Sequence, residues 1–62
     1  MPKRLEVTLV GKSGNAFAIL GACQKVAQRE WTPEEWEKFR IKATSGNYDH
    51  LLQTVMEYFD VN

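Results

Sequence analysis

The residues that could do chemistry in this sequence fall in two short polar segments, "GKSGN" (residues 11–15) and "NYDH" (residues 47–50). Each segment stands at the start of a predicted helix, where unpaired backbone N–H groups attract anions. In the first segment Lys12 would add positive charge and Ser13 a hydroxyl group, which is typical of phosphate binding. The segment is not a Walker A loop, because the first glycine of that motif would fall at Glu6. The alternative interpretation is a tight connection between a strand and a helix.

The second segment places a tyrosine, a carboxylate and an imidazole in one helical turn. Tyr48 could stack on a nucleotide base. An acid–base pair of Asp49 and His50 is not favoured, because adjacent helical residues point in different directions. We therefore expect no catalytic residues and no enzyme activity. The alternative is a capped helix start with a solvated histidine. The ligand-binding residues predicted from the two segments are Gly11, Lys12, Ser13, Gly14, Asn15, Tyr48, Asp49 and His50.

The remaining candidates for chemistry are weak. With one cysteine and one histidine, the chain has no cluster at zinc-ligand spacing, so we predict no metal site and no cofactor. Cys23 lies in an apolar run, where a free cysteine behaves as a small hydrophobic residue. Trp31 and Trp36 are expected to pack in the core, with an interaction surface as the alternative use.

The elements that must position these residues follow from periodicity and capping signals. Residues 4–10 alternate apolar and polar side chains and predict one strand. Asn15 can cap a helix over 16–30, with Gly14 supplying a backbone conformation that other residues resist. This helix is apolar on all sides from 16 to 23, so we expect it to be covered on more than one side.

Two further helices are predicted after it. In "WTPEEWEKF", Thr32 as N-cap, Pro33 at the first helical position and Glu35 three residues after the cap form a capping box. A third, amphipathic helix follows from helical spacing of the apolar residues Tyr48, Leu51, Leu52, Val55, Met56 and Phe59. We expect residues 60–62 to fray. A second strand in "EYFDV" is the weaker alternative, because the helical period runs through it.

The predicted fold class is α+β, a single domain of one N-terminal strand followed by three helices. A lone strand leaves backbone groups unpaired, and a chain of 62 residues has a small core. We therefore expect residues 5–9 to pair antiparallel with the same segment of a second copy in a two-fold homodimer. Small residues in the first helix would also let another backbone approach. The predicted interface residues are Leu5, Val7, Leu9, Ala18, Gly21 and Ala22.

Composition excludes several classes of protein. Hydrophobic residues make up 44% and charged residues 26% of the chain, which is globular, and the uncharged runs are too short to span a bilayer. Because the start "MPKRLEV" lacks the apolar core of a signal peptide, we expect a cytoplasmic protein. The net charge is zero, with an excess of basic residues in 1–29 and of acidic residues in 30–62. This balance argues against nucleic-acid binding.

The motifs "G-x-x-GNAFAILGA" and "SGNYDHLLQTVMEY" resemble a family of small uncharacterised proteins from tailed bacteriophages and prophage-carrying bacteria. The likeness runs from Val7 to Tyr58. The family pattern has a glycine before the tryptophan of the "WTPEE" turn, where this chain has Glu30. The resemblance implies a phage setting in a host cell, where such proteins often counter host defence by blocking a protein or sequestering a nucleotide signal.

Two functions follow from these observations. The leading hypothesis is a non-enzymatic homo-oligomer that binds a small anionic ligand, such as a nucleotide, between the two polar segments of its own or a neighbouring chain. The alternative is a protein-interaction module that inhibits a host protein.

Overall fold

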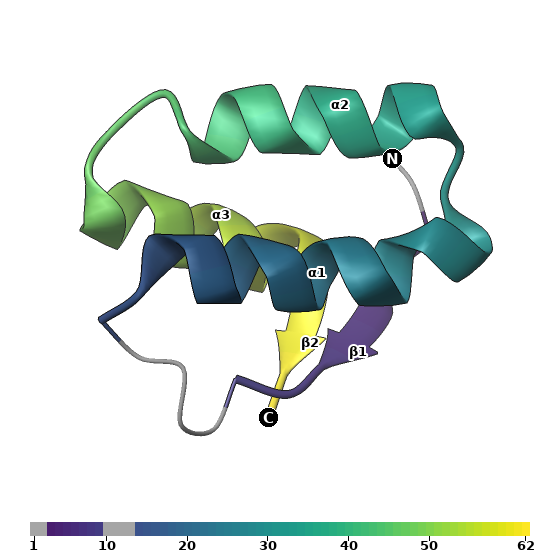
Figure 1. The fold of residues 1–62 in the computed structure, drawn as a ribbon, viewed down its shortest axis with the longest axis horizontal. Helices are drawn as coiled ribbons and strands as arrows, with labels where there is room; N and C mark the ends of the chain where they lie inside the picture. Colours follow the sequence, from purple (N-terminus) through teal and green to yellow (C-terminus); the bar gives the residue numbers. More distant parts are fainter. Residues whose placement is uncertain (1–2, 10–13) are drawn as a thin grey trace.

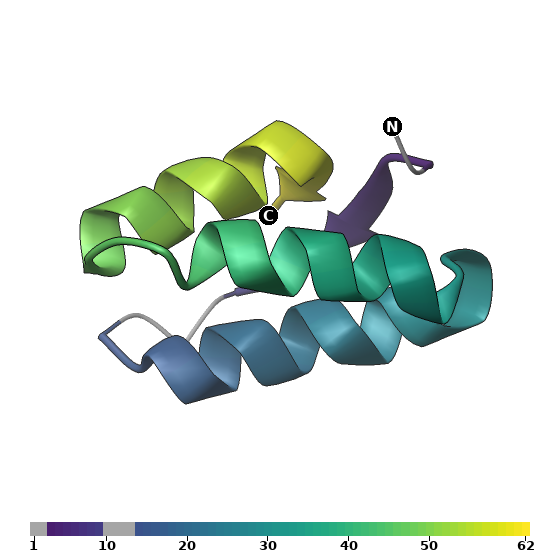
Figure 2. The same cartoon turned by 90° about the horizontal axis from the view of Figure 1, so that it is seen from above.

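The computed structural model describes residues 3–9 and 14–62 and contains three helices between two short strands. The elements in chain order are β1 (Leu5–Val7), α1 (Ala16–Glu30), α2 (Pro33–Ala43), α3 (Tyr48–Tyr58) and β2 (Phe59–Val61). α2 runs antiparallel to α1 and α3, and the strands lie on the side of α1 and α3 opposite to α2 (Figure 1). Seen from above, α2 lies between α1 and α3 (Figure 2). The α+β class and the three helices agree with the sequence prediction.

Side-chain caps define all three helix starts. The Asn15 side chain accepts a hydrogen bond from the backbone N–H of Ala18 at 3.1 Å. The capping box at the start of α2 is complete, with both reciprocal bonds between Thr32 and Glu35. The Asn47 side chain accepts from the third residue of α3 at 2.9 Å. Each cap pairs a helix-start N–H that has no partner within the helix.

The prediction of a single strand is wrong, because the end of the chain forms a second one. β2 pairs parallel with β1, with Leu5 opposite Phe59 and Val7 opposite Val61. Asn62 continues the ladder, since its N–H donates to Val7 O at 2.9 Å and its carbonyl accepts from Leu9 N at 3.2 Å. Residues 60–62 therefore do not fray in the way we expected. The helical period misled the prediction at Phe59, whose backbone is extended (φ −131°, ψ 154°).

The second strand removes the reason for pairing β1 across a homodimer. β1 has a partner in its own chain, so residues 5–9 do not need a second copy to satisfy this edge. Val7 is buried, and Leu5 and Leu9 are half-buried against the same core. These three predicted interface residues therefore pack inside the chain.

The core is continuous and rich in aromatic rings. Phe39 of α2 lies at its centre, with ring centroids 5.7 Å from Trp31, 5.2 Å from Tyr58 and 5.3 Å from Phe59. Trp31 is 6% exposed, and its indole Nε1 donates to the Lys3 carbonyl at 2.7 Å. The core role expected for this tryptophan is confirmed. The buried hydrophobic residues are Val7, Ile19, Cys23, Ala27, Trp31, Phe39, Ala43, Leu51, Val55 and Phe59.

The first half of α1 is less covered than its sequence predicts. Ile19, Cys23 and Ala27 face the core, as the helical spacing requires. On the opposite side Phe17 is 88% exposed and Gly21 is also exposed, and no described residue covers this face. The apolar pattern therefore marks a helix that is buried on its inner side only.

Candidate functional site

The described part of the first polar segment, which begins at Gly14, lies beside the second polar segment. The backbone N–H of Gly14 donates to Tyr48 Oη at 2.6 Å, which joins positions 34 residues apart. Gly14 has φ +84°, in the left-handed region that favours glycine, so the chain turns sharply before α1. α1 and α3 begin at the same end of the molecule (Figure 1). Residues 11–13 of the first segment, with the predicted contacts Gly11, Lys12 and Ser13, lie outside the described residues.

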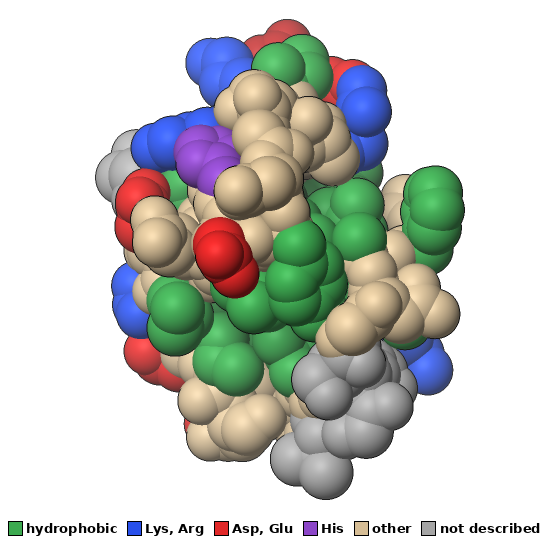
Figure 3. Space-filling view, turned by 90° about the vertical axis from the view of Figure 1, so that its left-hand side faces the viewer, with side chains coloured by type: hydrophobic (Ala, Val, Ile, Leu, Met, Phe, Trp, Pro, Cys, Tyr) green, Lys and Arg blue, Asp and Glu red, His purple; other side chains and the backbone are tan. Residues whose placement is uncertain are grey.

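A hollow of about 200 Å³ adjoins this junction, and we call it the α1–α3 hollow. Its surface is mostly apolar, with the polar groups of Thr44, Asn47 and Tyr48 among its lining residues. Pockets that enclose a drug-sized ligand measure roughly 300–1,000 Å³, so this hollow could hold a single ring and leave the rest of a ligand outside. Hydrophobic side chains gather at the centre of this end, with charged side chains around them (Figure 3). The lining residues are Ala16, Leu20, Ala43, Thr44, Gly46, Asn47, Tyr48 and Leu51.

The electrostatics of this end are set by two helix starts. Each start carries a partial positive charge of about half an elementary charge. α1 has no acidic residue in its first turn, whereas α3 carries the exposed carboxylate of Asp49 in its own. The arrangement suits a negatively charged group near α1, and Asp49 opposes one near α3.

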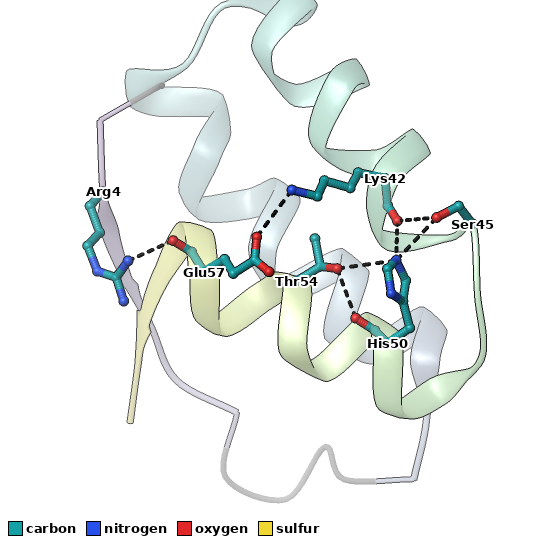
Figure 4. A network of polar contacts seen from close by, with 6 residues as sticks. All are labelled: Arg4, Lys42, Ser45, His50, Thr54 and Glu57. Atoms are coloured by element: carbon teal, nitrogen blue, oxygen red, sulfur yellow. Dashed lines mark hydrogen bonds and ion pairs between the residues drawn. The ribbon is translucent and has the colours of Figure 1, made fainter.

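His50 is directed away from the Gly14–Tyr48 junction. Its Nε2 lies 2.8 Å from the Lys42 carbonyl and 3.2 Å from Ser45 Oγ, which ties α3 to the end of α2 (Figure 4). The ring packs so closely over Gly46 that a Cβ there would lie 2.9 Å from His50 Cβ. Two positions along a helix turn a side chain by about 200°, which separates His50 from Tyr48. The structure thus gives His50 a connecting role between helices and does not bring it to the junction.

Thr54 completes this polar network inside the protein. It is 1% exposed, and its hydroxyl donates to the His50 carbonyl one turn earlier at 2.8 Å. Lys42 Nζ forms an ion pair with Glu57 at 3.2 Å farther along α3 (Figure 4). The network joins the end of α2 to α3 between His50 and Glu57. Among the described residues, no buried polar side-chain atom lacks a hydrogen-bond partner.

Cys23 is not arranged as a nucleophile. The side chain is fully buried, and burial raises the pKa of its thiol from 9.0 to about 12. The thiol therefore stays protonated at neutral pH, whereas nucleophilic cysteines need a depressed pKa or an adjacent base.

A second hollow, which sequence reasoning missed, lies between the end of α1 and the start of α2. It measures about 250 Å³, and we call it the tryptophan groove. Gln24 and Gln28, one turn apart on α1, line it together with the half-buried Trp36. Their i, i+4 spacing was the available signal, but an exposed glutamine pair is common on helices. The lining residues are Gln24, Ala27, Gln28, Trp31, Thr32, Pro33 and Trp36.

Residues 3–9 and 14–62 contain no group of three or more His, Cys, Asp or Glu side chains placed to hold a metal ion. Over the same residues, none of the helices is long and apolar enough to cross a membrane. Comparison of the chain with models of protein families, with curated proteins and with solved structures gave no match.

Proposed function

We propose that this protein is a non-enzymatic binding protein that holds a small anionic ligand, with a nucleotide as the best-fitting class, where α1 and α3 begin. The observation that carries the proposal is the 2.6 Å hydrogen bond from Gly14 to Tyr48. It joins two segments, each of which was selected for ligand chemistry on its own residues.

The parts of a nucleotide match the parts of this end. A phosphate would lie near the start of α1, where the helix dipole is positive and the first turn carries no carboxylate. The base would rest on the α1–α3 hollow beside the Tyr48 ring, because a base and an aromatic side chain attract through stacking. Neither part requires a nucleophile or a general base, and the protonated Cys23 thiol supplies neither.

The proposed biological setting rests on the resemblance of the two motifs to small phage proteins. In that setting the protein would act as a homo-oligomer in the cytoplasm of a host cell and sequester a nucleotide signal of host defence. A tightly held ligand would serve this purpose without turnover.

Isothermal titration calorimetry against linear and cyclic nucleotides, with inorganic phosphate as a separate probe, tests the proposal. Tyr48→Ala should weaken nucleotide binding by about five- to 150-fold, since stacking contributes roughly 1–3 kcal/mol per base. Asp49→Asn should strengthen binding about two- to fivefold, because it removes a carboxylate that opposes the anion near a helix start. Glu34→Gln removes the same charge from the first turn of α2 and should leave the affinity unchanged.

Opposite effects of the Tyr48 and Asp49 substitutions would separate ligand recognition from a general loss of structure. No heat signal with any member of the panel, or equal effects of Asp49→Asn and Glu34→Gln, would exclude this site.

The tryptophan groove favours a second candidate, a module that inhibits a host protein by holding one of its extended, proline-rich segments. Aromatic-lined grooves flanked by hydrogen-bonding side chains recognise such segments. Trp36 is the residue to change, because Trp31 is part of the core. A host protein that is retained by the wild-type chain and lost with Trp36→Ala would support this function, and equal retention by both would exclude it.

A further inference from the structure

The outward face of α1 carries an exposed aromatic ring and, one turn later, a glycine. Phe17 is 88% exposed, more than any other large hydrophobic residue described. Gly21 follows four positions later, so the two lie on the same face about 6 Å apart along the helix axis. A Cβ built at Gly21 would meet no heavy atom within 4 Å. A projecting side chain therefore stands next to an open, flat position.

These two features complement each other when two copies of α1 pack antiparallel. In a contact with two-fold symmetry, each pair of residues occurs twice with the roles exchanged. A two-fold axis between positions 17 and 21 brings the Phe17 ring of each copy over Gly21 of the other. We propose that a second copy of this chain docks on this face, with the two Phe17 rings seated on the two glycines.

The flanking residues suit a second copy. Ala18 and Ala22 are small and half-buried, so they let the two helix backbones approach. From Asn15 to Gln24, α1 carries no charged side chain, and antiparallel helix dipoles attract each other.

The basic residues of the two copies also stay apart. The first one on the outward face is Lys25, about 9 Å along the helix from the axis. The two Lys25 side chains would then lie about 18 Å apart, beyond the screening length of about 8 Å in physiological salt. A second copy supplies both complementary features, an open glycine for the Phe17 ring and a ring for the open glycine.

This dimer keeps Ala18, Gly21 and Ala22 from the interface predicted from the sequence but does not pair residues 5–9 of two copies, and it does not depend on ligand binding. Phe17 and Gly21 do not line the α1–α3 hollow. One face of a helix of 15 residues, about 22 Å long, forms an interface below the roughly 1,600 Å² of a standard complex. We therefore expect a weak association that depends on concentration.

Sedimentation velocity from about 10 µM to about 1 mM measures this association. The wild-type chain should shift from a 7.1 kDa monomer toward twice that mass. Phe17→Ser should remain monomeric throughout. Gly21→Ala should raise the Tm, because alanine favours helix, and yet weaken the dimer about tenfold, because its methyl group would collide with the opposing ring. Gln53→Ala, at an exposed position of α3 that lines neither hollow, is the control and should dimerise normally.

A dimer lost in Phe17→Ser and weakened in a more stable Gly21→Ala would support the proposal. A wild-type chain that is monomeric at the highest concentration would overturn it. A dimer that persists unchanged in both variants would also overturn it, because the contact would then lie elsewhere. Calorimetry with nucleotides tests the ligand-binding proposal separately, because a monomer contains the whole proposed nucleotide site.

Discussion

Replacing Arg4 by methionine should strongly destabilise the protein, because this side chain clamps the end of α3. Nη1 donates to the Glu57 carbonyl at 2.7 Å, and Nη2 donates to the carbonyls of Met56 at 2.9 Å and Phe59 at 3.0 Å. The last carbonyls of a helix have no partner within it, and a cation there also favours the helix dipole. Nε forms an ion pair with Asp60 at 2.6 Å, so the same side chain holds β2 beside β1.

The size of the effect follows from these contacts. The Arg4 side chain is 50% exposed, so each carbonyl bond is assigned about 0.5–1 kcal/mol rather than its buried value. Adding less than about 1 kcal/mol for the exposed ion pair gives a total of roughly 2–3 kcal/mol. A domain of 62 residues has a total stability of about 3–9 kcal/mol. At roughly 4–8 °C per kcal/mol, the Tm should fall by about 10–20 °C.

Urea and thermal unfolding followed by far-ultraviolet circular dichroism measure this change. Arg4→Lys keeps the charge but lacks the planar fork, and it should recover less than half of the lost stability. Lys3→Met is the control, because it removes the neighbouring charge and only an exposed pair with Glu30 at 3.6 Å. Equal losses in Arg4→Met and Lys3→Met would refute the clamp, as would an Arg4→Met midpoint equal to that of wild type.

Three further predictions test other parts of the fold. Because burial raises the pKa of Cys23 from 9.0 to about 12, the folded chain keeps a proton that the unfolded chain loses above pH 9. The free energy of unfolding should therefore fall with rising pH by up to about 1.4 kcal/mol per unit between these values, and urea titrations of Cys23→Ala should lack this part of the slope. Thr32→Ala breaks the capping box and should cost about 1 kcal/mol in urea unfolding; an unchanged midpoint would show that the box is redundant. Gly14→Ala places a side chain at φ +84° and should cost about 1–2 kcal/mol, whereas a stable variant in thermal unfolding would mean that this turn can relax.

The helices could be predicted from the sequence because their signals are local. Asn15, Thr32 and Asn47 each cap a helix with atoms three residues away, so the information lies within one turn of the chain. The amphipathic spacing of the third helix also identified its inner face, on which Leu51 and Val55 are buried. These features need no knowledge of distant partners.

β2 could not be predicted in the same way, because the residues that stabilise it are far away in the sequence. The helical pattern continues through Phe59, but α3 ends one residue earlier. One of the contacts at this end is the hydrogen bond from Arg4 to the Phe59 carbonyl, 55 positions away. A strand of three residues has little preference of its own, and its partner decides its conformation.

The candidate site was predictable in part. Local signals selected both helix starts, and the structure joins Gly14 to Tyr48. His50 was grouped with them by its position in the sequence, but the rotation of the helix directs it to the carbonyl of Lys42. The exposed face of α1 around Phe17 could not be predicted either. A run of apolar residues does not reveal which side of the helix the rest of the chain will cover.

The parallel pairing of β1 with β2 has a consequence for biosynthesis. Leu5 is synthesised more than fifty residues before its partner Phe59. Until Phe59–Val61 has been synthesised, β1 lacks its partner strand and the core lacks the buried ring of Phe59. The two strands can therefore pair only after all three helices have been made, and a chain cut before Phe59 would leave β1 without its partner.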